Sequence, residues 1–235
     1  MPQTQKKNYK MLWMVTFQVF KCEVCAKSYF IGDIMMIEAD ISLGFDLEGS
    51  LTEMVPIMAH PPLIFSDLSL NRFLETIITV STKVWRVQKQ FLQAMHFLSL
   101  QTLEENPQLR KGIKLDFKRT DILETSLEKV QSLLDRINFP LWINADIING
   151  PGLLKFNKKV NPNVFLDLVK TLVPEATISP GFTTSALANP PMYEQGQIDE
   201  MVEQLHIHQC FGLKITFPIR GMFAGMFAIN SKINP

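Results

Sequence analysis

The run GIKLDF, residues 112–117, begins at a glycine and alternates apolar with charged side chains. Successive side chains of a β-strand point to opposite faces, so this run predicts a strand with one apolar face and one face carrying Lys114 and Asp116. Short runs rich in β-branched or aromatic residues and bounded by Gly, Pro or Asn also predict strands. They are Met35–Ile41, Val55–Ala59, Pro140–Ile148, Ala176–Ser179 and Lys214–Ile219.

Amphipathic helical patterns lie between several of these predicted strands. Asn161 followed by Pro162 is typical of a helix start, because asparagine caps the first turn and proline suits the first helical position. Alternating strands and helices predict an α/β fold with parallel strands and outer helices, either a TIM-like barrel or a doubly wound open sheet. No glycine-rich phosphate motif follows a strand, which disfavours the nucleotide-binding forms. Apolar residues at helical spacing are Leu127, Val130, Leu134 and Ile137; Phe165, Leu168, Val169 and Leu172; and Ile198, Met201, Val202 and Leu205.

The composition is that of a folded globular protein. The chain has 235 residues, 46% of them hydrophobic, and its 23 basic residues balance its 23 acidic ones. This hydrophobic content excludes a disordered chain, and the lack of a basic excess argues against nucleic acid as a partner. No run of about 18 apolar residues occurs, so we expect no transmembrane helix.

The N-terminal region permits two interpretations. Lysines among the first ten residues precede an apolar run at 11–20, as in a signal peptide, and a signal would place the protein outside the cell. Glu23, however, occupies the place of a small cleavage-site residue, which weakens that interpretation. The other interpretation is a buried strand, because β-branched and aromatic residues dominate Val15–Phe20. The sequence therefore leaves the localisation unknown.

A long helical pattern extends from Leu70 to Glu105 and exceeds an ordinary crossover helix in length. It predicts either one long helix or two stacked helices. We expect a helical insertion at about residues 82–109 that packs on the outside of the domain; the alternative is a helix that binds a partner or a membrane surface.

Polar pairs interrupt several of the predicted strands. Residues i and i+2 share a face, so each pair points the same way. Burying such groups is costly unless a cation or hydrogen bonds offset the cost. In parallel α/β folds, ligands bind at the carboxyl ends of the strands. The groups are Glu38 with Asp40; Lys114 with Asp116 and Lys118; Asn144 with Asp146; and His60, which ends its strand.

These residues favour an acidic site that holds a metal ion, with a structural ion-pair network as the alternative. Carboxylates from different strands are ligands suited to hard cations, so the expected cofactor is Mg²⁺ or Ca²⁺. A Schiff-base role for Lys114 is disfavoured, because the nearby carboxylate of Asp116 stabilises the charged amine.

Six sequence blocks, in order, resemble the menorin family and together cover about residues 34–220. This is a specific match, because the blocks carry the polar strand residues described above and come in the family's order. The blocks are MMIEAD (35–40), PIMAHPP (56–62), GIKLDFK (112–118), PLWINADI (140–147) with GPG at 150–152, ATISPGFTT (176–184) and TFPIR (216–220).

The menorin family is in turn similar to the phospholipase-C-like glycerophosphodiester phosphodiesterase superfamily, and the resemblance implies an incomplete or divergent (β/α)₈ TIM-like barrel. It implies Glu38, Asp40 and Asp116 as metal ligands. It implies His60 as the acid or base and Lys118 as the group that neutralises a phosphate oxygen. The expected phosphate- or substrate-binding residues are Lys114, Asn144, Asp146 and Arg220.

The chain also departs from the family pattern. The family carries a Trp-Ala-His-Ala block on the first strand, whereas no histidine precedes His60 here. We therefore divide the chain into a divergent N-terminal segment (1–33), a menorin-like barrel domain (34–220) and a divergent, truncated tail (221–235). The missing histidine favours a non-catalytic extracellular interaction protein with a cell-surface adhesion partner. The alternative is a metal-dependent phosphodiesterase or lyase acting on a glycerophosphodiester or lysophospholipid.

Overall fold

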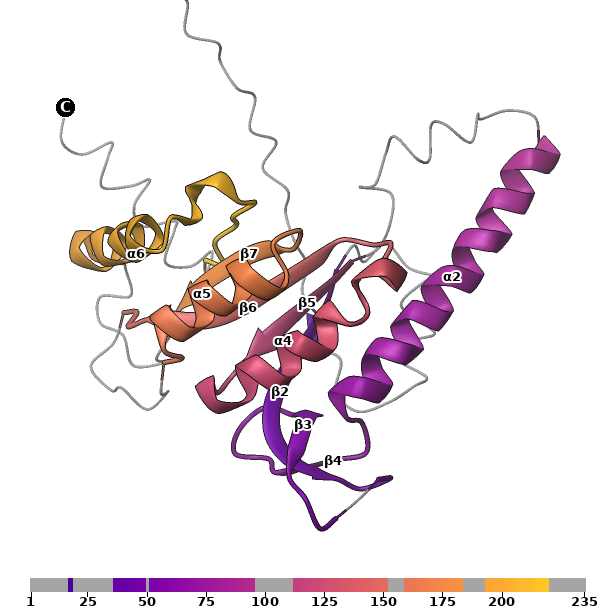
Figure 1. The fold of residues 1–235 in the computed structure, drawn as a ribbon, viewed down its shortest axis with the longest axis horizontal. Helices are drawn as coiled ribbons and strands as arrows, with labels where there is room; N and C mark the ends of the chain where they lie inside the picture. Colours follow the sequence, from indigo (N-terminus) through magenta and orange to yellow (C-terminus); the bar gives the residue numbers. More distant parts are fainter. Residues whose placement is uncertain are drawn as a thin grey trace, which may run out of the picture.

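The computed structural model describes six segments of the chain: residues 17–18, 36–49, 51–95, 112–151, 159–183 and 193–219. For 17–18 and 84–95 only the backbone is described. These segments form a mixed α/β fold in which helices cover a mainly parallel sheet (Figure 1).

The sheet is built from parallel strands whose spatial order follows the chain, β1-β2-β5-β6-β7. The register places Asp40 beside Asp116, Asp116 beside Asn144, and Asn144 beside Ser179. A chain order without reversal differs from a doubly wound sheet, in which the order reverses at a switch point. The bounds are β1 Phe17–Gln18, β2 Met36–Asp46, β5 Gly112–Phe117, β6 Leu141–Ile148 and β7 Thr177–Phe182.

One face of the sheet is apolar and packs under the helices. Its central side chains, among them Ile37, Leu115 and Ile143, are buried together with residues of the helices in one core. Figure 1 shows α4 and α5 lying along this face over β5 and β6. The helices are α2 Leu70–Met95, α4 Leu123–Gln131, α5 Pro162–Leu172 and α6 Gln195–Ile207, with 3-10 turns at Thr120–Ile122, Leu134–Arg136 and Cys210–Gly212.

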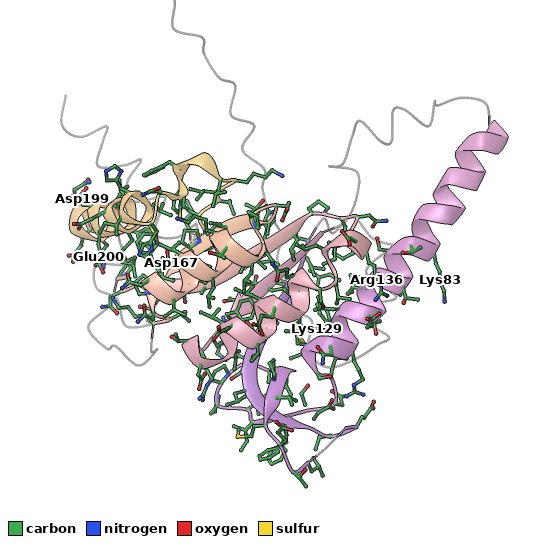
Figure 2. All side chains as sticks on the ribbon, in the orientation of Figure 1. Lys83, Lys129, Arg136, Asp167, Asp199 and Glu200 are labelled. Atoms are coloured by element: carbon green, nitrogen blue, oxygen red, sulfur yellow. The ribbon has the colours of Figure 1, made fainter. Side chains whose placement is uncertain are left out.

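The helix α5 begins where the sequence predicts. The Asn161 side chain accepts hydrogen bonds from the backbone N–H groups of Asn163 (3.0 Å) and Val164 (3.3 Å), and Pro162 occupies the first turn. Farther out, Arg136 pairs with Glu75 at 2.6 Å and connects the turn after α4 to α2 (Figure 2).

The predicted parallel arrangement is wrong for the strand expected at Val55–Ala59. It forms β3 (Val55–Met58), which runs antiparallel to β2, and the short β4 (Phe65–Ser66) pairs with the end of β2. The physical reason is the connection: too few residues separate β2 from β3 for the crossover helix that a parallel pair requires.

The final predicted strand, Lys214–Ile219, is reduced to a parallel bridge between Ile215 and Ile178. The backbone N–H of Ile178 donates to Lys214 (2.8 Å), and that of Thr216 donates to Ile178 (2.9 Å). No pairing closes the sheet into a barrel within the described segments.

The structure bears on two other features of the sequence. The backbone at Phe17–Gln18 pairs with Ile37 and Glu38 of β2, which supports the strand interpretation of the N-terminal apolar run. Residues 70–95 of the long helical pattern form one continuous helix, α2, of 26 residues, whose C-terminal half extends past the sheet (Figure 1). The rest of that pattern, and the end of the insertion expected at about 82–109, lie outside the described residues. None of the helices in the described ranges has the length and hydropathy needed to cross a bilayer.

Candidate metal centre

The sheet face opposite the helices carries the polar residues of the sequence motifs. Glu38 and Asp40 alternate with Ile37 and Ala39 on β2, so the carboxylates point away from the core that the apolar residues enter. Because β2 and β5 are in parallel register, Lys114 lies beside Glu38 and Asp116 beside Asp40. The predicted pairs thus meet on one face.

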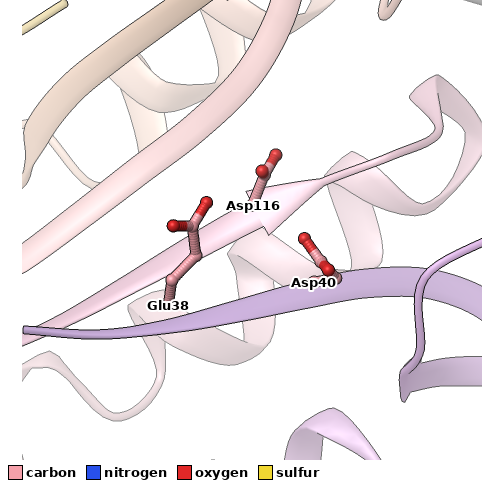
Figure 3. A group of neighbouring side chains, drawn as sticks. All are labelled: Glu38, Asp40 and Asp116. Carbon is pink, nitrogen blue, oxygen red and sulfur yellow. The ribbon is translucent and has the colours of Figure 1, made fainter. Parts of the chain in front are cut away.

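The three carboxylates of Glu38, Asp40 and Asp116 form one cluster (Figure 3). One oxygen from each lies within 4.8 Å of the others. Asp40 and Asp116 are buried and Glu38 is half-buried. This is the only group of three or more potential ligands that the described segments bring together, and it is the set predicted from the sequence.

Two lysines neutralise part of this charge. Lys114 Nζ lies 2.9 Å from Glu38 Oε1, and both side chains are largely buried. Lys118 Nζ lies 2.6 Å from Asp116 Oδ2 and 3.0 Å from Asp40 Oδ1, bridging the two strands. Three carboxylates and two ammonium groups leave a net charge of −1 on the cluster. The ion-pair network and the acidic cluster are therefore the same residues.

The electrostatic environment keeps Lys118 protonated. Burial by itself lowers the pKa of this amine, but the carboxylates of Asp116 and Asp40 outweigh burial through charge attraction and hydrogen bonding, and the pKa lies well above its ordinary value. Lys118 is therefore a fixed positive charge at neutral pH.

The cluster also retains an oxygen suited to a cation. Asp116 Oδ1 is buried and has no hydrogen-bond partner among the residues that the structure describes, while its Oδ2 pairs with Lys118. A buried carboxylate oxygen without a partner carries a substantial desolvation cost, which a bound cation would offset. The oxygen donors present fit Mg²⁺ or Ca²⁺, both of which prefer carboxylate and water ligands.

The polar row continues across the sheet. Asn144 lies beside Asp116, and its Oδ1 accepts a 2.8 Å hydrogen bond from the buried Ser179 hydroxyl of β7. Asp146 is half-buried beside Gly181, where a Cβ atom would collide with Asp146 Oδ1. Ser179 was missed as a site residue; a polar side chain in a predicted buried strand was the one signal that the sequence offered for it.

The remaining predicted residues lie apart from the cluster or outside the described segments. The backbone N–H of Ala59 donates to Asp40 O at 3.0 Å, which brings the chain before His60 next to β2. The His60 side chain is exposed, with Nδ1 2.6 Å from Pro61 O, and it is not part of the carboxylate group. Arg220 lies outside the described residues.

Comparison with known proteins identifies relatives for most of this chain. The family model described as the Menorin N-terminal domain matches residues 25–230. The human protein FAM151B is 32% identical over 186 residues, which cover 79% of this chain and 54% of that protein. The chain thus spans about half the length of this curated relative. No solved structure matches the chain.

Proposed function

The chain belongs to the menorin family, and from that premise we propose that it is a non-catalytic interaction protein that binds Mg²⁺ or Ca²⁺. The cation would be held by Glu38, Asp40 and Asp116. The observation that carries the proposal is the approach of three carboxylate oxygens to within 4.8 Å of one another on adjacent strands. The family membership confirms the resemblance drawn from the six sequence blocks.

The charges around the cluster support a cation of modest affinity. The two lysines reduce the net charge to −1, so a divalent ion has less attraction than at a site of carboxylates alone. Lys118 forms ion pairs with both Asp40 and Asp116, but its contact with Asp116 uses Oδ2 and leaves Oδ1 available to bind a cation. A cation and the lysines together would form a positive surface able to accept an anionic group of a partner.

Within the described segments no acid–base pair is positioned at the cluster, which supports the non-catalytic assignment. The only histidine near β2 in the described segments, His60, has an exposed side chain turned to the Pro61 carbonyl. Strand β1 pairs with β2 through Phe17 and Gln18, and neither of these residues is a histidine. An adhesion protein of the cell surface is the partner that the family resemblance suggests, which would place this chain outside the cell.

We further propose that the sheet is part of a divergent TIM-like barrel spanning about residues 34–220. Strands that follow chain order, with α2, α4 and α5 between successive strands and α6 after β7, support this topology. The bridge at Ile215 adds a further parallel segment beyond β7. In such a barrel the polar row from Glu38 to Ser179 would face the interior.

A metal-dependent phosphodiesterase or lyase is the second candidate. The observation in its favour is that two lysines pair with the carboxylate cluster on the polar face of the sheet, where positive charge could bind a phosphate group. A bound Mg²⁺ or Ca²⁺ would supply Lewis-acid stabilisation of negative charge on a phosphodiester. Lys118 and Lys114 would pair with phosphate oxygens, and His60 would transfer a proton. Glycerophosphodiesters and lysophospholipids are the expected substrates.

Thermal melts with and without millimolar Mg²⁺ or Ca²⁺ test the cation site. At about 100 times Kd the wild type should gain roughly 2.7 kcal/mol, or about 5–10 °C in Tm, and Glu38→Gln/Asp40→Asn should gain nothing. The exposed pair Asp199→Asn/Glu203→Gln is the matched control and should respond like wild type. Equal responses of wild type and the Glu38/Asp40 variant would refute the site.

A substrate panel then separates the two functions. Glycerophosphodiesters and lysophospholipids are offered with each cation to wild type and to His60→Ala. The interaction assignment requires no turnover by wild type. Turnover that His60→Ala abolishes would replace it with the enzyme assignment.

A further inference from the structure

The carboxyl half of β2 leaves the main sheet and forms a separate projection. Pairing with β5 ends at Ile41, after which β2 pairs with β3 and β4 alone. Figure 1 shows these strands projecting beyond the rest of the sheet, beside the first turns of α2. We call the described residues 42–49 and 51–67 the β2–β4 lobe.

The lobe exposes an unusual concentration of large apolar side chains. Half of the twelve such residues in the described segments belong to it, each between 40% and 55% exposed. Exposed apolar residues that gather in one small region, rather than singly, are typical of interaction surfaces. They are Leu47, Leu51, Met54, Leu63, Ile64 and Phe65.

Internal contacts make the lobe an ordered platform for these side chains. The rings of Phe45 and Phe65 stack with centroids 5.5 Å apart. The buried Ser66 hydroxyl donates to Met58 O at 3.0 Å. At the base, Arg72 of α2 pairs with Asp46 and Glu48, which connects the lobe to the helix. The surface is therefore preorganised, and little conformational entropy of the lobe would be lost when a partner binds.

The lobe is also one-sided in charge. No lysine or arginine occurs from residue 42 to residue 71, whereas the chain as a whole is neutral. Arg72 neutralises part of this charge at the base, but Glu53, which lies between Leu51 and Met54 in the chain, is exposed. The acidic residues of the stretch are Asp46, Glu48, Glu53 and Asp67.

We propose that the β2–β4 lobe binds a protein segment that presents apolar side chains beside lysine or arginine. Complementary charge selects this occupant. An anionic lipid surface would be repelled by the carboxylates, and a two-fold dimer would place two acidic lobes against each other. The proposal goes beyond the cation site and does not require it, because none of the lobe's residues belongs to the carboxylate cluster.

The test measures binding of the whole chain to two synthetic 18-residue amphipathic peptides by fluorescence anisotropy, in chelator so that the cation site plays no part. One peptide combines leucine with lysine and the other leucine with glutamate. We expect the lysine peptide to bind at least about tenfold more tightly, and Leu47→Ser/Leu63→Ser to weaken it about tenfold. Glu53→Lys should also weaken it, and more so at low salt.

Matched variants on α6 provide the controls. Val202→Ser/Ile207→Ser removes apolar side chains that are 49% and 58% exposed, and Glu203→Lys makes the same charge change outside the lobe. Both should bind like wild type, and all variants should keep the wild-type Tm because the changed side chains are exposed. Equal binding of the two peptides, or equal loss in the α6 variants, overturns the proposal.

Two further outcomes would assign the lobe to another occupant and also overturn the proposal. One is binding to phosphatidylcholine vesicles that Leu47→Ser/Leu63→Ser abolishes, with no preference for the lysine peptide. The other is self-association in sedimentation runs that the same variant abolishes.

Discussion

Replacing Lys118 with methionine tests whether the carboxylate cluster is a cation site or only an ion-pair network. The change removes an ammonium that lies 3.0 Å from Asp40 Oδ1 and 2.6 Å from Asp116 Oδ2. Those two side chains are only 5% and 8% exposed, so solvent screens them weakly once they lose their partner. Because Lys118 is itself 20% exposed, we take the lower end of the usual cost, about 3 kcal/mol, or roughly 6–12 °C in Tm.

The same substitution should increase the response to cations. Loss of Lys118 changes the net charge of the cluster from −1 to −2, since one lysine then faces three carboxylates. A divalent ion should therefore bind the variant more tightly than wild type and recover much of the lost stability. Each tenfold gain in affinity adds about 1.4 kcal/mol of stabilisation at saturating cation.

The assay is a set of thermal melts of wild type and Lys118→Met across a Mg²⁺ and Ca²⁺ titration. Lys83→Met removes an exposed lysine from α2 and is the matched control; it should stay within about 0.5 kcal/mol of wild type and show the wild-type cation response. A destabilised Lys118→Met that cations fail to restore would refute the cation site and leave a structural network. An undiminished Tm without cation would refute the assigned strength of the Lys118 pairs.

Three further predictions follow from local contacts. Asn161→Ala should cost about 1 kcal/mol by removing the α5 cap, whereas Asn161→Asp should retain most of the stability in urea unfolding. Burial raises the pKa of the Cys210 thiol, so alkylation near pH 8, followed by mass spectrometry, should modify Cys210 more slowly in the folded chain than in urea. The pKa of Lys118 is raised in the folded state, so its contribution is complete below the ordinary lysine value of 10.5 and is lost only as pH rises through the higher folded value. The difference in unfolding free energy between wild type and Lys118→Met should therefore stay constant from about pH 7 to about pH 9.

The carboxylate cluster was predictable because strand periodicity is a local property. Glu38 and Asp40, like Lys114 and Asp116, lie two residues apart, and that spacing alone fixes their common face. The helix start at Asn161 was predictable for the same reason, since capping involves neighbouring residues. Family membership added the expectation that these separate motifs belong to one site.

The arrangement around the cluster was less predictable. Which lysine pairs with which carboxylate depends on the parallel register of β2 and β5, and the structure places Lys114 on Glu38 and Lys118 between Asp40 and Asp116. The Ser179 contact with Asn144 depends likewise on the register of β6 with β7. Register is set by the packing of whole strands, which no single motif contains.

The sequence by itself determined the family, the α/β class, most of the strands and helices, and the carboxylates on one face, because each follows from periodicity or a matched motif over a few residues. The tertiary structure decided that β3 turns back antiparallel on β2, that the α2 pattern is one long helix, and that apolar and acidic residues gather on the β2–β4 lobe. Those outcomes depend on contacts between residues distant in the chain, whose free energies appear only when the elements pack together.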